Sequence, residues 1–268
     1  MKLPSLRIYA FAYLAFLYAP ILLLPLFAFN DGTIIAFPLK GFTLDWFSQM
    51  FANDTLGRAV RNSMIIAGST AVLATAFGIF AARAGTRFSF PAKGPIMGLI
   101  MLPLVLPEIM IGGSLLLVLL AIGIELSILT VILGHVLIAT PYTIAILNTA
   151  FASLDRSLEE AAYDLGEGKL STFRLITLPL VLPGIISSML IAFTISLDEF
   201  IIAFFLAGNE PTLPTYIFSQ LRFPKQIPMI MALGTCLVLL SIILLTIAEY
   251  VRRRGLKKTG AKDTGGFL

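Results

Sequence analysis

The chain has 268 residues, of which 58% are hydrophobic and 13% are charged, and its formal net charge is +4. A soluble domain carries about a quarter of its residues as charged side chains, so this composition excludes an ordinary soluble enzyme, a disordered chain and a nucleic-acid-binding protein. The single cysteine excludes a disulfide framework, and the single histidine excludes a multi-histidine metal site. The composition predicts an all-α, polytopic membrane protein.

Apolar stretches between charged residues are long enough to cross a membrane, which requires about 20 residues of helix. Inside hydrocarbon every backbone polar group must be satisfied within the segment, so these stretches are expected to be helical. The third stretch contains Pro103 and Pro107, which should kink it. The first is interpreted as a retained helix rather than a cleaved signal peptide. We predict six transmembrane helices, near residues 9–29, 62–82, 96–122, 127–148, 184–207 and 228–250.

The basic residues that flank these helices favour one orientation. With both termini in the cytoplasm, fourteen of the nineteen basic residues lie on the inner side and five on the outer side. Short loops on the cytoplasmic side of membrane proteins carry an excess of lysine and arginine. We therefore expect both termini to be cytoplasmic. The five outer basic residues are Lys40, Arg58, Arg61, Arg222 and Lys225.

A charged loop separates the fourth and fifth predicted helices. Ser157 is followed three residues later by Glu160, which fits a capping box at the start of a short helix. Apolar residues then recur at helical spacing, and Gly166 is suited to ending the helix. We predict an amphipathic helix over residues 158–165, which either packs on the inner face of its own chain or docks into a groove of a partner. Its apolar residues are Leu158, Ala161, Ala162 and Leu165.

This loop resembles the EAA loop of importer-type ATP-binding-cassette permeases. The pattern in that family is E-A-A, three residues, G, nine residues and then I-x-L-P, and every fixed position is present here. Further stretches resemble the spermidine/putrescine (polyamine) type: residues 18–20, 154–166 and 193–199. That type commonly has Asp-Asp where this chain has Asp198-Glu199. The residues that match the loop pattern are Glu160, Ala161, Ala162, Gly166, Ile176, Leu178 and Pro179.

The resemblance implies a type I importer permease core over residues 56–250. A first helix and an outer interfacial loop (1–55) precede it, and a basic cytoplasmic tail (251–268) follows it. It also implies that the loop over 153–179 couples to a cytoplasmic ATP-binding subunit, present as a dimer. A second homologous permease subunit, a periplasmic solute-binding protein and a multi-pass location in the bacterial inner membrane follow from the same resemblance. ATP and Mg²⁺ are then expected in the partner ATPase, with no cofactor, metal site or catalytic residue in this chain.

Other functions are less well matched by the sequence. A proton-coupled secondary transporter would also carry intramembrane acids, but it would show pseudo-repeated halves and would need no EAA loop. A membrane-embedded enzyme would need catalytic groups, and neither G-x-S-x-G nor H-E-x-x-H occurs. His135 is interpreted as a helix-packing residue. Within the importer class, another organic cation, an amino-acid derivative or ferric iron are the alternative substrates.

Glu108, Asp198 and Glu199 are the candidate residues of a substrate pathway. Glu108 and Asp198 each lie thirteen residues into a predicted helix, about 20 Å along its axis. A carboxylate at that depth costs at least about 2.5 kcal/mol on insertion scales, so it should not face lipid. Either these acids share a proton or pair with a basic residue of a partner permease, or they offer anionic sites to a cationic substrate. Asp198 and Glu199 are about 100° apart on a helix, so at most one of them faces Glu108.

Overall fold

The computed structural model describes the backbone of residues 4–259 and the side chains of residues 8–243 and 246. Lys2 and Lys262 lie outside the described residues, as do the side chains of Arg7 and of the basic residues at 252–258 that contributed to the predicted orientation. The regular elements of the described part are helices, and an isolated antiparallel bridge joins Asn30 and Phe42. The chain divides into two compact units, Thr55–Tyr216 and the combination of Met1–Asp54 with Ile217–Leu268.

The unit formed by the two ends of the chain is built on α1 (Pro4–Ala28), α2 (Asp45–Phe51), η3 (Pro224–Gln226) and α12 (Ile227–Thr259). Helix α12 packs on both α1 and α2. Asn30 fixes the loop after α1, because its backbone carbonyl accepts a hydrogen bond from the Trp46 indole (2.9 Å) and its side-chain oxygen accepts one from the Lys40 backbone N–H (2.9 Å). The aromatic outer loop therefore folds back on itself, and the Phe29 ring stacks on that of Phe42.

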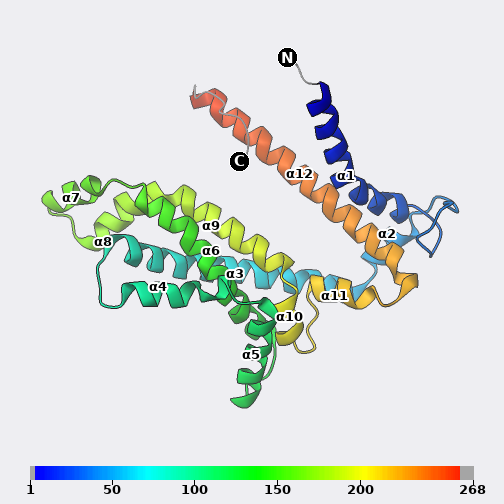
Figure 1. Ribbon diagram of the computed structural model, residues 1–268, viewed down its shortest axis with the longest axis horizontal. Coiled ribbons are helices and arrows are strands. Elements are labelled where there is room, and N and C mark those ends of the chain that lie inside the picture. Colours follow the sequence, from blue (N-terminus) through cyan, green and yellow to red (C-terminus); the bar gives the residue numbers. More distant parts are fainter. Residues whose placement is uncertain (1–3, 260–268) are drawn as a thin grey trace. The chain divides into compact units, whose positions relative to one another are not determined.

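The second unit contains the remaining helices, and α6 lies in its middle. Helix α6 runs beside α9 and also contacts α10 (Figure 1). Its buried residues include Val131, Ile144, Leu147 and Phe151. The elements are α3 (Asp54–Arg87), α4 (Lys93–Met101), η1 (Leu102–Leu104), α5 (Glu108–Ala121), α6 (Ile128–Ala152), α7 (Arg156–Asp164), α8 (Lys169–Thr172), the π-helical η2 (Phe173–Thr177), α9 (Leu178–Asp198), α10 (Ile201–Leu206) and α11 (Leu213–Gln220).

Small residues allow the helices of this unit to approach closely, as membrane helices commonly do. A Cβ at Gly78 would collide with the Thr143 side chain, and one at Gly112 would lie 2.8 Å from the Phe205 ring. These two glycines therefore permit close packing, whereas Gly113 faces open space. An alanine cluster joins α3, α6 and α9, formed by Ala71, Ala74, Ala139 and Ala192.

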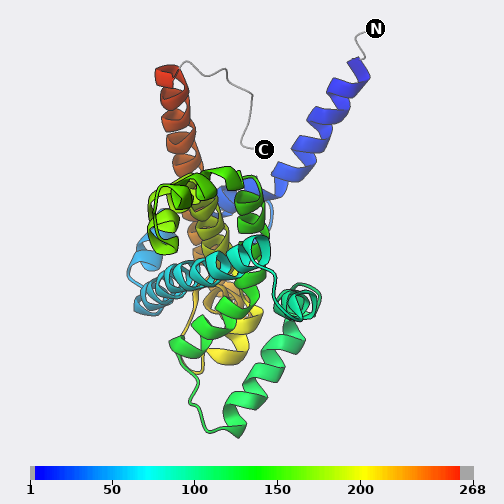
Figure 2. The same ribbon diagram turned by 90° about the vertical axis from the view of Figure 1, so that its left-hand side faces the viewer.

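Within the part of the chain that the structure describes, five helices are long and apolar enough to cross a membrane, and the number is six if a bent pair counts as one broken span. The bent pair is Lys93–Leu104 with Glu108–Ala121, whose axes differ by 103°. Figures 1 and 2 show α4 and α5 pointing in different directions. The kink expected from Pro103 and Pro107 is confirmed, but the expectation of one helix over 96–122 is wrong, because the backbone leaves the helix before Pro107.

The fifth predicted span also differs from the structure. A continuous apolar stretch of helix runs from Lys169 to Asp198, and α10 follows as a separate short helix after a break at Glu199 and Phe200. The prediction of one helix over 184–207 therefore placed both ends too late. The backbone at Glu199 is extended, with φ −69° and ψ 114°, and this conformation ends α9.

Candidate functional site

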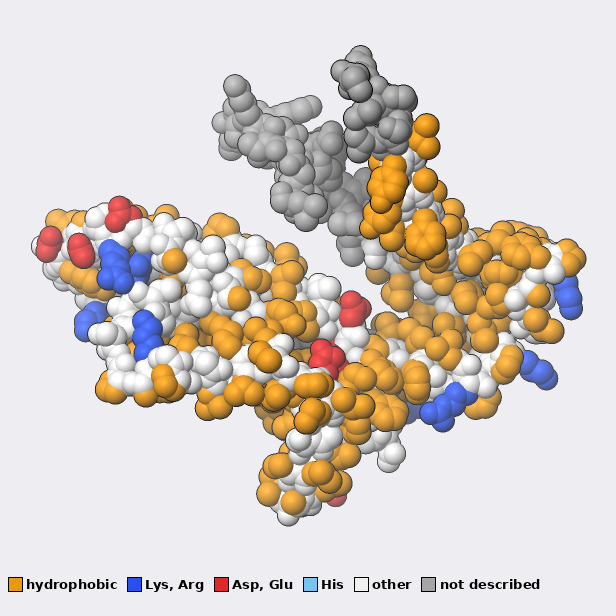
Figure 3. Space-filling model, viewed as in Figure 1, with side chains coloured by type: hydrophobic (Ala, Val, Ile, Leu, Met, Phe, Trp, Pro, Cys, Tyr) orange, Lys and Arg blue, Asp and Glu red, His pale blue; other side chains and the backbone are white. Residues whose placement is uncertain are grey.

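Helix α7 lies at the end of the long helices α6 and α9, where charged side chains gather in an otherwise largely hydrophobic unit (Figures 1 and 3). It begins after Asp155, whose carboxylate accepts a hydrogen bond from the Ser157 backbone N–H at 3.0 Å. That hydrogen bond holds the pKa of Asp155 below its usual value. The expected capping box of Ser157 and Glu160 is wrong, because Asp155 takes the capping position and places Ser157 inside the first turn.

Gly166 ends α7 in the left-handed conformation, with φ +89°. The Gly166 N–H donates to the Tyr163 carbonyl (2.9 Å), and the Glu167 N–H donates to the Ala162 carbonyl (3.0 Å). This pair of hydrogen bonds is a Schellman motif, which satisfies carbonyl groups at the helix end. The prediction that Gly166 ends this helix is confirmed.

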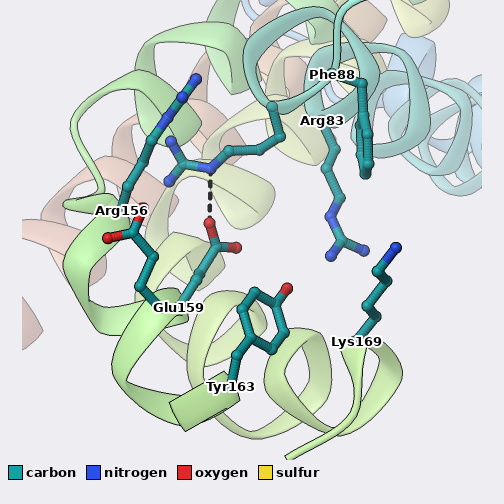
Figure 4. Close-up of a pocket in the computed structure, with 8 residues that line it drawn as sticks. Arg83, Phe88, Arg156, Glu159, Tyr163 and Lys169 are labelled. Carbon is teal, nitrogen blue, oxygen red and sulfur yellow. Dashed lines mark ion pairs between the residues drawn. The ribbon is translucent and has the colours of Figure 1, made fainter.

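The inner face of α7 is fixed by a buried polar network. Glu159 forms an ion pair with Arg87 of α3 at 2.8 Å, drawn as the dashed line in Figure 4. The Thr177 hydroxyl of η2 donates to the other Glu159 oxygen at 2.7 Å. Arg87 also donates to the Leu154 carbonyl at 2.9 Å. One carboxylate and one guanidinium thus attach α7 to the end of α3 and to the start of the α9 span, while Ala162 packs beside them.

The outer face of α7 is exposed and partly apolar. Leu158 is 44% exposed and Leu165 is 85% exposed, and Glu160 and Ala161 between them are also exposed. The sequence left two alternatives, packing on the chain itself or docking with a partner. The structure uses one face of the helix for the first and leaves a Leu158–Glu160–Ala161–Leu165 surface available for the second.

The last residues of the EAA pattern lie where the fifth span begins. Ile176 is half-buried in η2, and Leu178 starts α9 and packs against a core that contains Leu147 and Phe151. Pro179 is exposed at the second position of α9, where a missing N–H costs nothing. These residues shape the junction between the loop and α9 rather than extend the exposed surface of α7.

The three candidate pathway acids lie at the two helix breaks. Glu108 is the first residue of α5, directly after the bend, and its side chain is exposed. Asp198 is the last residue of α9 and is also exposed. Glu199 is buried, and its side chain accepts a hydrogen bond from the Ile202 N–H at 3.0 Å. Of the two neighbouring acids, Asp198 therefore exposes its carboxylate, whereas the Glu199 carboxylate caps α10.

The two breaks meet in space because α5 and α10 pack against each other. Gly112 of α5 makes this approach possible, since a Cβ at this position would lie 2.8 Å from the Phe205 ring and 3.5 Å from Ile202. Glu108 begins α5 and Glu199 caps α10, so the packing of these two helices places both acids at the same junction. Broken helices at membrane depth are tolerated where they are buried in protein or line a water-filled cavity, and transporters often place binding sites at such breaks.

Sequence reasoning missed Arg87, Glu159 and Thr177. Glu159 directly precedes the EAA pattern, but nothing in local spacing links it to an arginine at the end of α3. Thr177 occupies the variable position of I-x-L-P, where no particular side chain is expected. His135 was interpreted as a packing residue, and it is buried with its Nδ1 in a 2.7 Å hydrogen bond with Ser196 of α9. Its Nε2 is also buried but has no hydrogen-bond partner within the described residues.

The long apolar helices, their two breaks and the anchored loop helix define an integral membrane component of a transport system. The chain matches the family model described as "Binding-protein-dependent transport system inner membrane component" over residues 74–256. It belongs to this family, and the predicted resemblance to importer permeases is confirmed.

Individual relatives agree with this family. The chain is 37% identical over 231 residues to a putrescine transport system permease protein of Escherichia coli (PotI), covering 83% of this chain and 82% of the relative. It is 34% identical over 247 residues to a spermidine/putrescine transport system permease protein of Haemophilus influenzae (PotC), covering 92% and 95% of the two chains. Among solved structures, a chain of a bacterial ABC transporter that imports the acidic polysaccharide alginate has the same fold. Its TM-score is 0.73 at 14% identity, and the match covers 93% of this chain and 99% of that one.

Proposed function

We propose that this chain is the permease subunit of an ATP-driven importer that carries polyamines such as putrescine and spermidine across the bacterial inner membrane. ATP, with Mg²⁺, is hydrolysed on a separate cytoplasmic subunit dimer, and a periplasmic binding protein delivers the substrate. A second homologous permease subunit completes the pathway, and both termini of this chain lie in the cytoplasm. The observation that carries the proposal is the geometry of α7, whose inner side is anchored through Glu159 and whose outer side exposes Leu158 and Leu165.

This geometry would allow a movement of a docked subunit to be transmitted to the membrane-spanning helices. A helix that only covered its own chain would bury its leucines, yet Leu158 and Leu165 point outward. The buried Arg87–Glu159 pair and the Thr177 hydrogen bond connect the same helix to two membrane spans. A movement of a docked partner would therefore reach α3 and α9 directly.

The substrate class rests on the relatives and on the acids. The putrescine and spermidine/putrescine permeases cover most of this chain at 34–37% identity. Glu108 and Asp198 place exposed carboxylates at the helix breaks, where they would attract a cation and repel an anion. A polyamine carries several ammonium groups, which suit carboxylates at separate positions.

The docking role is tested with Leu165→Gln and Leu158→Gln, with Leu221→Gln as the matched control. Leu221 is 52% exposed but follows α11, outside the 153–179 loop. Burying one leucine is worth about 1.5–3 kcal/mol, so we expect each α7 variant to weaken association with the ATP-binding subunit about tenfold or more. The measurements are co-purification of that subunit with the tagged permease and ATP-dependent uptake of labelled putrescine. Failure of any ATP-binding subunit to co-purify with the wild-type chain, or unchanged association in both α7 variants, would contradict the proposal.

A further inference from the structure

Beside α7 lies a pocket of about 260 Å³ whose lining is unusually basic. It opens between the end of α3, the inner face of α7 and the start of α8, as Figure 4 shows. Its charged lining residues are Arg83, Arg87, Arg156 and Lys169, against Glu159 and Glu160. Four positive and two negative side chains leave a formal charge of +2.

The charges in this pocket are not evenly matched. Glu159 is paired with Arg87, and Arg156 donates to the Thr86 carbonyl at 2.9 Å. In the part of the chain that the structure describes, Arg83 and Lys169 have no carboxylate within ion-pair distance. Their charged ends nevertheless point into the same space, together with the Tyr163 hydroxyl (Figure 4).

Arg83 is held in this position by its surroundings. Its guanidinium carbon lies 4.1 Å from the centre of the Phe173 ring, so the ring supports one face of the group. Its Nε is buried and has no hydrogen-bond partner within the described residues. A guanidinium fixed beside an ammonium group, with donors unused, is an arrangement that an anion would complete.

We propose that Arg83, Lys169 and Tyr163 bind a phosphate group, supplied by the headgroup of an anionic phospholipid or by free phosphate. The site is separate from the transport proposed above and does not depend on it. Guanidinium, ammonium and phenol groups are all hydrogen-bond donors to phosphate oxygens. The α3 span ends at Arg87 and the α9 span begins at Lys169. Two apolar spans thus end at this pocket. Basic pockets between spans on the cytoplasmic side of membrane proteins bind anionic headgroups.

The test uses the purified full chain in a neutral detergent and the double variant Arg83→Gln/Lys169→Gln. The matched control is Arg222→Gln/Lys225→Gln, which removes the same charge outside the pocket. Arg222 also lies over a phenylalanine ring, 5.7 Å from its centre. Native mass spectrometry measures the affinity for phosphatidylglycerol and for phosphatidylcholine. The melting temperature in inorganic phosphate, against chloride at equal ionic strength, tests the free anion.

We expect phosphatidylglycerol to bind the wild-type chain and the control with equal affinity. It should bind the double variant roughly 30-fold more weakly, because each basic side chain near an anionic surface is worth about a fivefold change in affinity. Lys169 is exposed, so Lys169→Gln alone keeps the fold and should lose about fivefold. The site is assigned to the free anion if inorganic phosphate stabilises the wild-type chain but not the double variant, and if phosphatidylglycerol does not bind selectively. Equal behaviour of double variant and wild type with both ligands, an equal loss in the control, or no binding to the wild type overturns the proposal.

Discussion

Glu159 and Glu160 are adjacent glutamates with opposite surroundings. Glu159 is buried and is held by Arg87 and Thr177, whereas Glu160 is exposed at the edge of the basic pocket beside α7. Neighbouring residues on a helix differ by about 100° in direction, so a helix with one buried face separates them in this way. The first glutamate therefore positions α7, and the second is left for contact with a partner.

The ion pair predicts non-additive effects of substitution. Glu159→Gln or Arg87→Gln leaves one charge in a nearly buried site, since the two side chains are only 9% and 10% exposed. Breaking one partner of a buried pair costs about 3–5 kcal/mol, so either variant should release α7 from α3. The double variant removes both charges and should be less affected than the sum of the two.

The measurement is the rate of tryptic cleavage after Arg156 and Lys169 in the purified chain, followed by mass spectrometry. We expect faster cleavage in both single variants and partial recovery in the double variant. Cleavage at the wild-type rate in both single variants would show that the pair does not anchor α7.

The left-handed end of α7 gives a second prediction. A Cβ at Gly166 would meet no atom within 4 Å, so a substitution there tests backbone conformation alone. A branched side chain at φ +89° is strained by about 1–3 kcal/mol, whereas asparagine tolerates this region. Gly166→Val should therefore lower putrescine uptake about tenfold at equal membrane expression, and Gly166→Asn should retain most of it. Equal uptake by the two variants would mean that the presentation of α7 does not depend on its C-terminal cap.

At the scale of helices, close packing depends on where glycine occurs. Gly68 and Gly78 lie on the same helix, α3, but only Gly78 faces another helix. The Thr143 hydroxyl donates to the Ala74 carbonyl at 2.9 Å one turn away, so α3 and α6 are held in contact at this level. A side chain at Gly78 has no room unless this hydrogen bond is disturbed.

This contrast predicts opposite effects of the same substitution. Gly78→Ala should destabilise the chain by about 1–3 kcal/mol, because its Cβ collides with Thr143 and approaches Leu147 to 3.0 Å. Gly68→Ala faces open space and should be neutral or stabilising, since alanine favours helix over glycine by about 1 kcal/mol. Melting temperatures of the detergent-purified variants measure both effects. A Gly78→Ala variant as stable as Gly68→Ala would contradict the packing of α3 on α6.

The sequence predicted helices well where the signal was local. The spans were recognisable because charges are missing from them, the bend before α5 because of Pro103 and Pro107, and the end of α7 because of Gly166. The break after Asp198 was not predictable, because no proline or glycine occurs at residues 198–200. The side chain that stabilises the break is Glu199, which accepts a hydrogen bond from the first turn of α10. The Arg87–Glu159 pair was missed because it depends on how α3 and α7 meet, which no spacing within one element reveals.

In the molecule as a whole, α9 connects the two candidate sites. Its N-terminal end follows Thr177, which binds Glu159 of α7, and its C-terminal end is Asp198. Helix α9 has 21 residues, so its two ends are about 30 Å apart. The depth argument from straight spans holds for neither acid. Helices α4 and α5 differ in direction by 103° before Glu108, and Asp198 is the last residue of a 30-residue span rather than the thirteenth. The packing of α5 on α10 still brings the two acidic breaks together. Helix α9 therefore connects the coupling loop to the proposed cation site.

The acids at these breaks give the last prediction. Glu108→Gln and Asp198→Asn keep the size of each side chain and remove its charge, and both side chains are exposed, so neither change leaves a buried group unpaired. An interaction of a carboxylate with a cation is worth about 1.5–3 kcal/mol, so each variant should lose about tenfold or more in uptake of labelled putrescine. Glu199→Gln should lose less uptake, because its amide oxygen can still accept a hydrogen bond from the Ile202 N–H.

The control is Glu125→Gln, which changes an exposed acid between α5 and α6 and should transport normally. Membrane expression and basal ATPase activity establish that the variants remain assembled. Normal uptake by both Glu108→Gln and Asp198→Asn would make these acids structural, and the proposal of a cationic substrate would then rest on the relatives alone.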